Sequence, residues 1–350
     1  MNIATSIAAA EGRADPRPAG HPPVAIGKVG VLLINLGSPD APTKSAVRRY
    51  LLDFLSDKRV VEIPAFIWQP ILRGLVLTVR PRKTAANYAR IWQEDSPLRL
   101  NTRRQAEALA DAWPGVTVDF AMRYGNPSIP SRLEAMHAAG CDRILLAPLY
   151  PQYSSATTGT AIEHGWNSLD HMRWIPATRT LPSYHDHPAH IAALAASVRE
   201  GVAALDFEPE AVLASFHGMP KRTLELGDPY HCHCSKTARL LREALGWPEG
   251  RLRLCFQSRF GRAEWLQPYT EPTLEALAKE GIRKVAVVCP SFSVDCLETL
   301  EEIAIGAKEI FEHAGGTHFA YLPCLNDSAQ GIEMLRCIIG ESLAGWVPQG

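Results

Sequence analysis

A histidine stands where a buried run of residues ends, in the stretch AVLASFHGMP at residues 211–220. The residues before His217 are apolar, and the glycine and proline that follow end any regular structure. In open α/β sheets, ligands bind beyond the carboxyl ends of the strands. His217 is therefore a candidate for proton transfer or metal binding, although a solvated loop histidine without a function fits the same residues.

Two glutamates in VDCLETLEEI, residues 294–303, form a second candidate. Glu298 and Glu302 would share one face of a helix, where like charges are unfavourable unless they share a proton or meet a cation. A structural alternative is a capping box formed by Asp295 and Glu298. We expect His217 from one lobe and this acidic helix from the other to face each other across a cleft. Such a set suits a divalent metal or proton removal from a ligand.

Three other stretches carry weaker signals. HCHC at residues 231–234 contains two histidines and two cysteines, the residue types of a zinc site. In an extended segment only alternate residues share a face, so at most two of them could bind one ion. The hydroxyl-rich loop at residues 150–160 could bind an anion through its amides. Arg123, at a predicted strand end, could pair with a carboxylate. The chain lacks the glycine-rich nucleotide-binding motifs and the G-x-S-x-G elbow of hydrolases.

Apolar, strand-like runs alternate with helical patterns along the chain. The predicted strands are 29–37, 117–125, 142–151, 211–218, 251–259 and 283–292. The predicted helices are 101–113, 131–140, 235–246, 272–281 and 295–315. This alternation predicts an α/β fold with two similar lobes built on parallel sheets. We expect a disordered tail at 1–27, an N-terminal lobe at 28–185, and a C-terminal lobe at 186–350 whose last helix crosses back.

The bulk composition limits the classes of function. The 350 residues suffice for two domains, and 46% hydrophobic with 21% charged residues is a globular composition. The net charge of −1 gives no field that draws the chain to nucleic acid. No apolar run reaches the roughly 18 residues of a membrane span, and the first residues lack a secretory signal. We expect a cytoplasmic protein whose cysteines are mainly thiols.

The segment 63–83, IPAFIWQPILRGLVLTVRPRK, is apolar but interrupted by polar residues. It is consistent with a core helix pair kinked at Pro70. It is equally consistent with an exposed apolar lip that holds a greasy ligand or touches a membrane surface, with Arg80, Arg82 and Lys83 at the lipid headgroups. We call residues 63–83 the lip.

Several motifs occur together in an order and spacing that resemble one family. They are NLGSP, FLSDKRVVEIP, MRYG, YPQYSSATTG, SFHGMP, GDPY and FSVDCLETLEEI, and they resemble the ferrochelatases, which insert ferrous iron into a porphyrin. The resemblance implies two Rossmann-like, chelatase-like lobes with four-stranded parallel sheets and a porphyrin cleft between them. It also implies a lyase that inserts Fe²⁺ into protoporphyrin IX to give protohaem, the last step of haem biosynthesis.

The resemblance assigns roles to individual residues. His217 and Glu298 correspond to the residues that serve the metal and the pyrrole protons, and Glu302 to a carboxylate further along a helix that can contain a π-turn. The lip corresponds to the segment over the porphyrin edge. The residues that correspond to the lining of the porphyrin cleft are Leu36, Ser96, Arg123, Tyr124, Tyr153 and Phe292.

Some positions depart from the family pattern. Cys296 stands where many members have histidine. Ser155 stands where some members have an internal cysteine ligand of a two-iron two-sulfur cluster, and the final residues lack a cysteine-rich tail, so we expect no such cluster. Fe²⁺ is then a substrate, and the partners are a porphyrin and, through the lip, the surface of the inner membrane. Coproporphyrin insertion, another tetrapyrrole chelatase, and a haem or metal carrier remain alternatives.

Overall fold

The computed structural model describes residues 20–21, 24–261 and 263–347. Most of the tail predicted at 1–27 lies outside the described residues, and its described part contains no helix or strand.

Eight strands form two separate parallel sheets of four, and the fold class predicted from the sequence is confirmed. The first sheet has the order β2-β1-β3-β4, and the second has the equivalent order β6-β5-β7-β8. The strands are β1 (Lys28–Gly37), β2 (Val116–Tyr124), β3 (Cys141–Pro148), β4 (Ala177–Thr180), β5 (Ala211–His217), β6 (Leu252–Gln257), β7 (Lys284–Val288) and β8 (His318–Leu322). All six predicted strands are present; β4 and β8 were not predicted.

Helices cover both faces of each sheet, which is why the central strands are apolar throughout rather than alternating. One cluster of buried residues covers a face of both sheets and joins the two lobes. It is completed by α4 (Pro97–Ala112), α7 (Pro188–Ala203), α9 (Tyr230–Leu245) and α12 (Ala329–Ser342). The outer faces are covered by α5 (Ile129–Ala138) and α6 (Thr160–Asp170) on the first sheet, and by α10 (Thr270–Lys279) and α11 (Lys308–His313) on the second.

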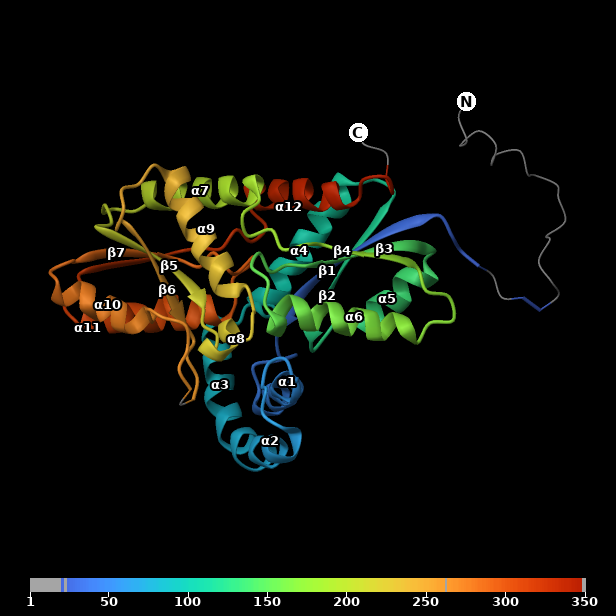
Figure 1. Cartoon of the computed structure of the whole chain (residues 1–350), viewed down its shortest axis with the longest axis horizontal. Helices are drawn as coiled ribbons and strands as arrows, with labels where there is room; N and C mark the ends of the chain where they lie inside the picture. Colours follow the sequence, from blue (N-terminus) through green and yellow to red (C-terminus); the bar gives the residue numbers. More distant parts are fainter. Residues whose placement is uncertain (1–19, 22–23, 262, 348–350) are drawn as a thin grey trace.

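The two sheets lie side by side along the long axis of the molecule (Figure 1). The predicted lobe boundary at 185/186 falls in the loop between β4 and α7. Helix α12 packs against both α7 and α4, so the C-terminal helix contacts the N-terminal lobe. The short helix α8 (Lys221–Glu225) follows β5.

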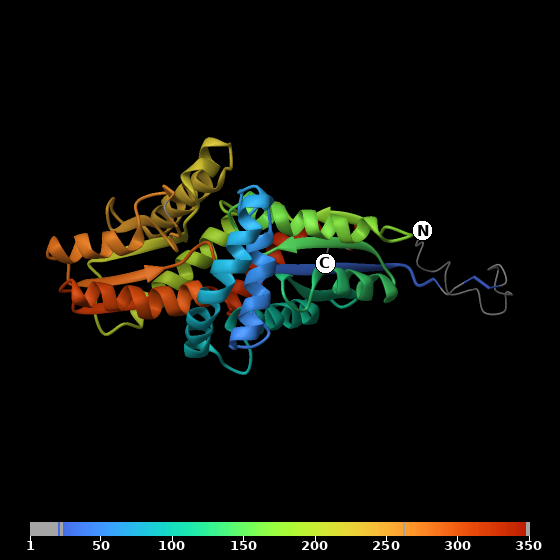
Figure 2. The same cartoon turned by 90° about the horizontal axis from the view of Figure 1, so that it is seen from below.

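A helical arm projects from the body beside the carboxyl end of β1 (Figures 1 and 2). It consists of α1 (Lys44–Ser56), α2 (Ala65–Ile71), the π-helical turn η2 (Leu72–Val76) and α3 (Leu77–Ile91). Trp68 anchors the lip, because its indole nitrogen donates to the carbonyl of Leu55 at 2.6 Å. The opposite side of the lip is exposed, with Phe66 80% and Val79 68% accessible. Each interpretation therefore describes one face of the lip: Trp68, Leu72 and Leu77 are buried in a core cluster, whereas the opposite apolar face is exposed.

Candidate active site

His217 is the last residue of β5, and its ring is held in one tautomer. Its Nδ1 lies 2.7 Å from the carbonyl oxygen of Gly218. Because a carbonyl oxygen only accepts, the proton of the neutral ring is on Nδ1, and the lone pair of that tautomer is on Nε2. The backbone amide donates to Ser291 Oγ at 3.2 Å, and the ring lies 6.4 Å from that of Phe292. His217 therefore presents Nε2 as a base or a metal ligand, next to a predicted cleft residue.

The periodicity predicted a helix over 295–315, in which the resemblance allowed a π-turn, and the structure has a π-helix there. The π-helix η4 (Glu298–Ala307) continues directly into α11. The capping box is not formed, since the carboxylate of Asp295 instead accepts from Thr299, Tyr321 and Asn326. A π-helix inside an α-helical segment is rare and frequently marks a functional site.

Glu302 has an unusual affinity for a proton. Burial raises its pKa, and the charge of Glu298 adds to the effect, whereas hydrogen bonds from Ser258 oppose it; the result is a pKa of about 7. Its Oε1 accepts from the amide of Ser258 and its Oε2 accepts from the Ser258 hydroxyl, both at 2.6 Å. A carboxyl group with this pKa can accept and release a proton near neutral pH.

Glu298 faces the N-terminal lobe. A narrow hollow is lined by Glu298 together with Leu36 at the end of β1 and Ser96 at the start of α4. The negative charge of Glu298 also contributes to the raised pKa values of Tyr50 and Tyr88 on the arm, after burial as the main cause. The structure thus brings together Leu36, Ser96 and Glu298 around one hollow.

His217 and Glu298 come from the same lobe, and the prediction that they come from opposite lobes is wrong. His217 ends β5 and Glu298 comes after β7, and these two strands are neighbours in the second sheet. Gln257, the β6 partner of His217, donates through Nε2 to the carbonyl of Glu298 at 2.8 Å. The carboxyl ends of parallel strands meet at one edge of a sheet, so both groups belong to this edge, and α3 of the arm contacts the helix that carries Glu298.

Arg123 and Tyr124 are held by a carboxylate that the sequence reasoning missed. Arg123 Nη2 donates to Asp57 at 2.6 Å and its Nε donates to Thr160 at 2.8 Å, while the Tyr124 hydroxyl donates to Asp57 at 2.7 Å. Burial opposes ionisation of Asp57, but hydrogen bonds, first from Thr160, and the charge of Arg123 lower its pKa overall. Arg123 is therefore already paired, and Tyr124 is only 2% exposed.

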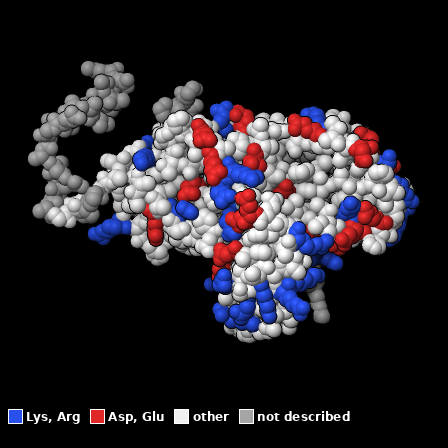
Figure 3. Space-filling model, turned by 180° about the vertical axis from the view of Figure 1, so that it is seen from behind, with Lys and Arg blue, Asp and Glu red and all other residues white. Residues whose placement is uncertain are grey.

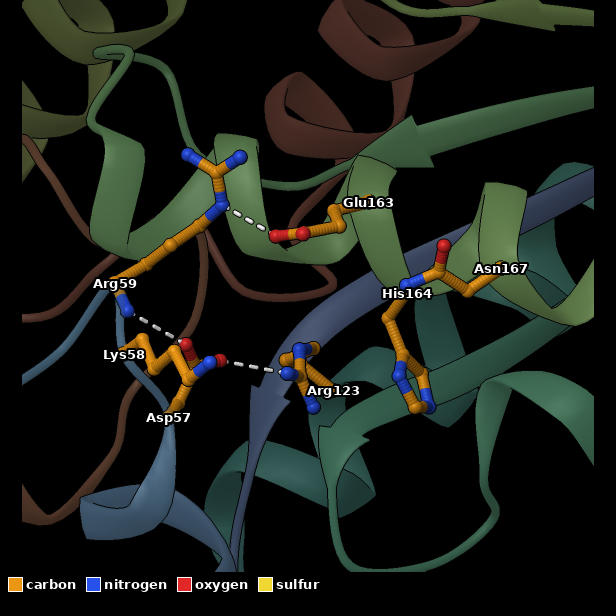
Figure 4. A pocket seen from close by; sticks show the side chains of 7 residues that line it. All are labelled: Asp57, Lys58, Arg59, Arg123, Glu163, His164 and Asn167. Carbon is orange, nitrogen blue, oxygen red and sulfur yellow. Dashed lines mark hydrogen bonds and ion pairs between the residues drawn. The ribbon is translucent and has the colours of Figure 1, made fainter. Parts of the chain in front are cut away.

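These groups border a charged pocket of about 440 Å³ (Figure 4). Its lining residues are Asp57, Lys58, Arg59, Arg123, Glu163, His164 and Asn167. Arg59 forms an ion pair with Glu163 and also donates to Ser155 Oγ at 2.8 Å. The two bound arginines leave Lys58 as the exposed cation of this pocket.

The HCHC stretch is helical, because α9 already begins at Tyr230. The extended geometry assumed for it is therefore wrong, and consecutive side chains point around the helix. The Nδ1 atom of His233 accepts from the amide of Tyr153 at 3.1 Å, and its ring stacks on that of His185 at 3.6 Å. Within the described ranges, no group of three or more His, Cys, Asp or Glu residues is arranged to hold a metal ion.

Comparison with known proteins decides the family. The sequence model of the ferrochelatase family matches residues 28–343. The chain belongs to the ferrochelatase family. The ferrochelatase of Rhizobium meliloti (strain 1021) is 56% identical over 333 residues, which cover 93% of this chain and 98% of the relative. That of Mesorhizobium japonicum (strain LMG 29417 / CECT 9101 / MAFF 303099) is 55% identical over 335 residues, covering 94% and 95%.

Solved structures support the fold. SirB from Bacillus subtilis with Fe³⁺ matches with a TM-score of 0.55 at 12% identity, covering 91% of this chain and 97% of that one. The multi-domain DR2241 from Deinococcus radiodurans matches with a TM-score of 0.50 at 14% identity, covering 89% and 55%. At these identities the likeness is one of fold, and the ferrochelatase family assignment depends on the sequence relatives.

Proposed function

We propose that this chain is a lyase that inserts Fe²⁺ into protoporphyrin IX to give protohaem, the last step of haem biosynthesis. The observation that carries the proposal is that His217 ends β5 while the helix with Glu298 and Glu302 follows the neighbouring strand β7, at one sheet edge of a ferrochelatase-family chain. Both the substrate metal and the porphyrin follow from the family; the roles of the residues are our proposal.

Porphyrin metallation requires that two pyrrole protons leave as the metal enters. Nε2 of His217 is free to take a proton or to bind the metal, because Nδ1 is committed to Gly218. Imidazole and carboxylate are donors that suit Fe²⁺, so His217 and Glu298 are the proposed metal-binding residues. Glu302, with its pKa of about 7, can carry protons away along the same helix.

The proposed substrate cleft lies at the junction of the lobes. Leu36 and Phe292 pack against one cluster of buried residues there, so the first and second lobes contribute neighbouring apolar walls. Ser96 accepts from the Ser38 hydroxyl at 2.6 Å and caps α4. We assign Tyr153 and Arg123 to the side of the cleft formed by the first lobe, in support of which Arg123 and Asp57 border the charged pocket there.

The proposal includes no iron–sulfur cluster. The position at which some family members have an internal cluster ligand is Ser155, whose hydroxyl accepts from Arg59 at 2.8 Å. Cluster irons are held by cysteine thiolates, in some centres with histidine. Fe²⁺ enters as the substrate.

We also propose that the lip makes peripheral contact with an anionic inner-membrane surface. Its exposed apolar side chains are Ile63, Phe66, Ile67, Ile71, Leu75 and Val79. Basic side chains surround them, among them Arg73, Arg82 and Lys83, and Figure 3 shows Lys and Arg gathered over the projecting arm. An apolar face with a basic border is typical of helices that lie at a membrane interface. Among the described residues, no helix is both long and apolar enough to cross a bilayer.

Anaerobic incubation of the purified chain with Fe²⁺ and protoporphyrin IX tests the main proposal. Loss of porphyrin fluorescence with repeated turnover supports it, and binding of one equivalent without turnover would instead indicate a carrier. A parallel reaction with coproporphyrin III tests the substrate, and a higher kcat/KM for that porphyrin would contradict our assignment. A reaction without protein corrects for spontaneous metallation.

A further inference from the structure

Ser258, the first residue after β6, has an unfavourable backbone conformation. Its φ is +66°, in the left-handed region that residues with a Cβ seldom adopt. Among the described residues only one other non-glycine residue, Asn326, has a positive φ. Asparagine tolerates this region well, whereas serine does not share that preference to the same degree. Such strain persists when the surrounding structure requires it, frequently at functional sites.

The left-handed conformation directs both donors of Ser258 to the same carboxylate. The amide donates to Oε1 of Glu302 and the hydroxyl donates to Oε2, each at 2.6 Å. In the part of the chain that the structure describes, no other group donates to this carboxylate. The nearby charges that act on it, Glu298 on η4 and Glu271 on α10, are both negative. Ser258 is thus what fixes the orientation of both oxygens.

The residues on either side of Ser258 hold neighbouring parts of the site. Gln257 donates to the carbonyl of Glu298 at 2.8 Å. Together with the Ser258–Glu302 contact, the end of β6 therefore contacts η4 at two residues about one turn apart. Phe260 receives the guanidinium of Arg80 from the arm, 4.7 Å above its ring. The segment from Gln257 to Phe260 therefore connects the acidic helix to the arm, and Ser258 is its contact with a functional side chain.

We propose that Ser258 is a positioning residue for Glu302, kept in a strained conformation because only there do its amide and hydroxyl hold both carboxylate oxygens. This inference rests on the proposed iron insertion, in which Glu302 carries protons from the site. Loss of the hydroxyl frees Oε2, so the carboxylate turns away from the direction in which it receives a proton. The proton-transfer step slows, while porphyrin binding, which Ser258 does not touch, is retained.

The test uses two variants of the full chain that lose the same hydroxyl but differ in backbone strain. Ser258→Gly keeps the amide and adopts a positive φ freely, whereas Ser258→Ala keeps the strain. We expect both to lower kcat for iron insertion by about tenfold, the effect of one hydrogen bond to a charged group, with KM for protoporphyrin within about twofold. The melting temperature of Ser258→Gly should equal or exceed that of the wild type, which separates slowing from unfolding.

A double-mutant cycle completes the test. In a Glu302→Gln background, Ser258→Gly should lower kcat by less than about twofold, because the group it positions has lost its proton-carrying role. Full wild-type kcat in Ser258→Gly, or an equal loss in both backgrounds, would overturn the positioning role alone. A wild-type chain that does not metallate porphyrin would overturn the proposed function, and the positioning role with it.

Discussion

Replacing Glu302 by glutamine is expected to stabilise the folded protein at high pH and to lower kcat for iron insertion. Burial holds the pKa of Glu302 at about 7, against an ordinary value of 4.5. Because the folded state binds the proton more tightly than the unfolded state, this group favours folding below pH 4.5 and loses that contribution as the pH rises through 7. The difference of about 2.5 pKa units corresponds to roughly 3 kcal/mol at pH 8.

The measurement is the free energy of unfolding in urea at pH 5 and pH 8, for the wild type and for Glu302→Gln. Glutamine is close in shape and cannot ionise, so the variant should gain about 2.5 kcal/mol on the wild type between the two values of pH. The exposed Glu94, replaced in the same way, serves as the matched control and should give the same difference at both values of pH. In the chelation assay the same Glu302→Gln variant should have a lower kcat.

The reasoning would be refuted by a stability difference between Glu302→Gln and wild type that does not change between pH 5 and pH 8. Such a result would mean that Glu302 is as well solvated in the folded chain as in the unfolded one. A gain in stability combined with wild-type kcat would support the raised pKa of Glu302 but contradict its role in the proposed proton route.

Three further outcomes are expected. His217→Ala should lower the rate of fluorescence loss by about 10²–10⁴-fold, the usual contribution of a general base, and a wild-type rate would contradict its role. Burial lowers the pKa of His190 to about 4, so the unfolded chain takes up a proton first as the pH falls below 6.5. Between pH 7 and pH 4.5, the free energy of unfolding in urea should therefore fall by up to about 3 kcal/mol less in His190→Leu than in the wild type. An equal fall in both proteins would contradict this prediction. Phe66→Glu combined with Leu75→Glu should reduce co-sedimentation with phosphatidylglycerol vesicles. The control Leu226→Glu changes an exposed apolar residue outside the lip and should not reduce it. Equal effects of the two proteins would contradict membrane contact through the lip.

Local patterns in the sequence were sufficient to predict most elements. The run that ends at His217 is buried up to its last residue, as its apolar composition indicated. Strands β4 and β8 were missed because they are short edge strands of mixed composition, ATRT and HFAYL, with mostly half-exposed residues. Such strands are defined by their neighbours in the sheet rather than by their own periodicity.

Residue spacing predicted some features of the acidic helix and not others. The pair Glu298 and Glu302 was correctly placed on one helix, and their electrostatic interaction is present. The π-helical winding was not derivable from spacing, and Asp295, which looked like a cap, is engaged by Tyr321 and Asn326 from later in the chain. Contacts from later in the chain, not local preference, decided the partners of Asp295.

The sequence by itself determined which side chains stand at strand ends, because hydrophobic periodicity is a local property of the chain. It placed His217 and Arg123 at strand ends and the two glutamates on one helix in this way. Only the tertiary structure decided their partners: Asp57, which binds Arg123 across 66 residues, and Ser258, which binds Glu302 across 44. Charge and proton affinity depend on burial and on groups that folding brings near, so the same residues acquire their chemistry only once the two sheets and the arm are assembled.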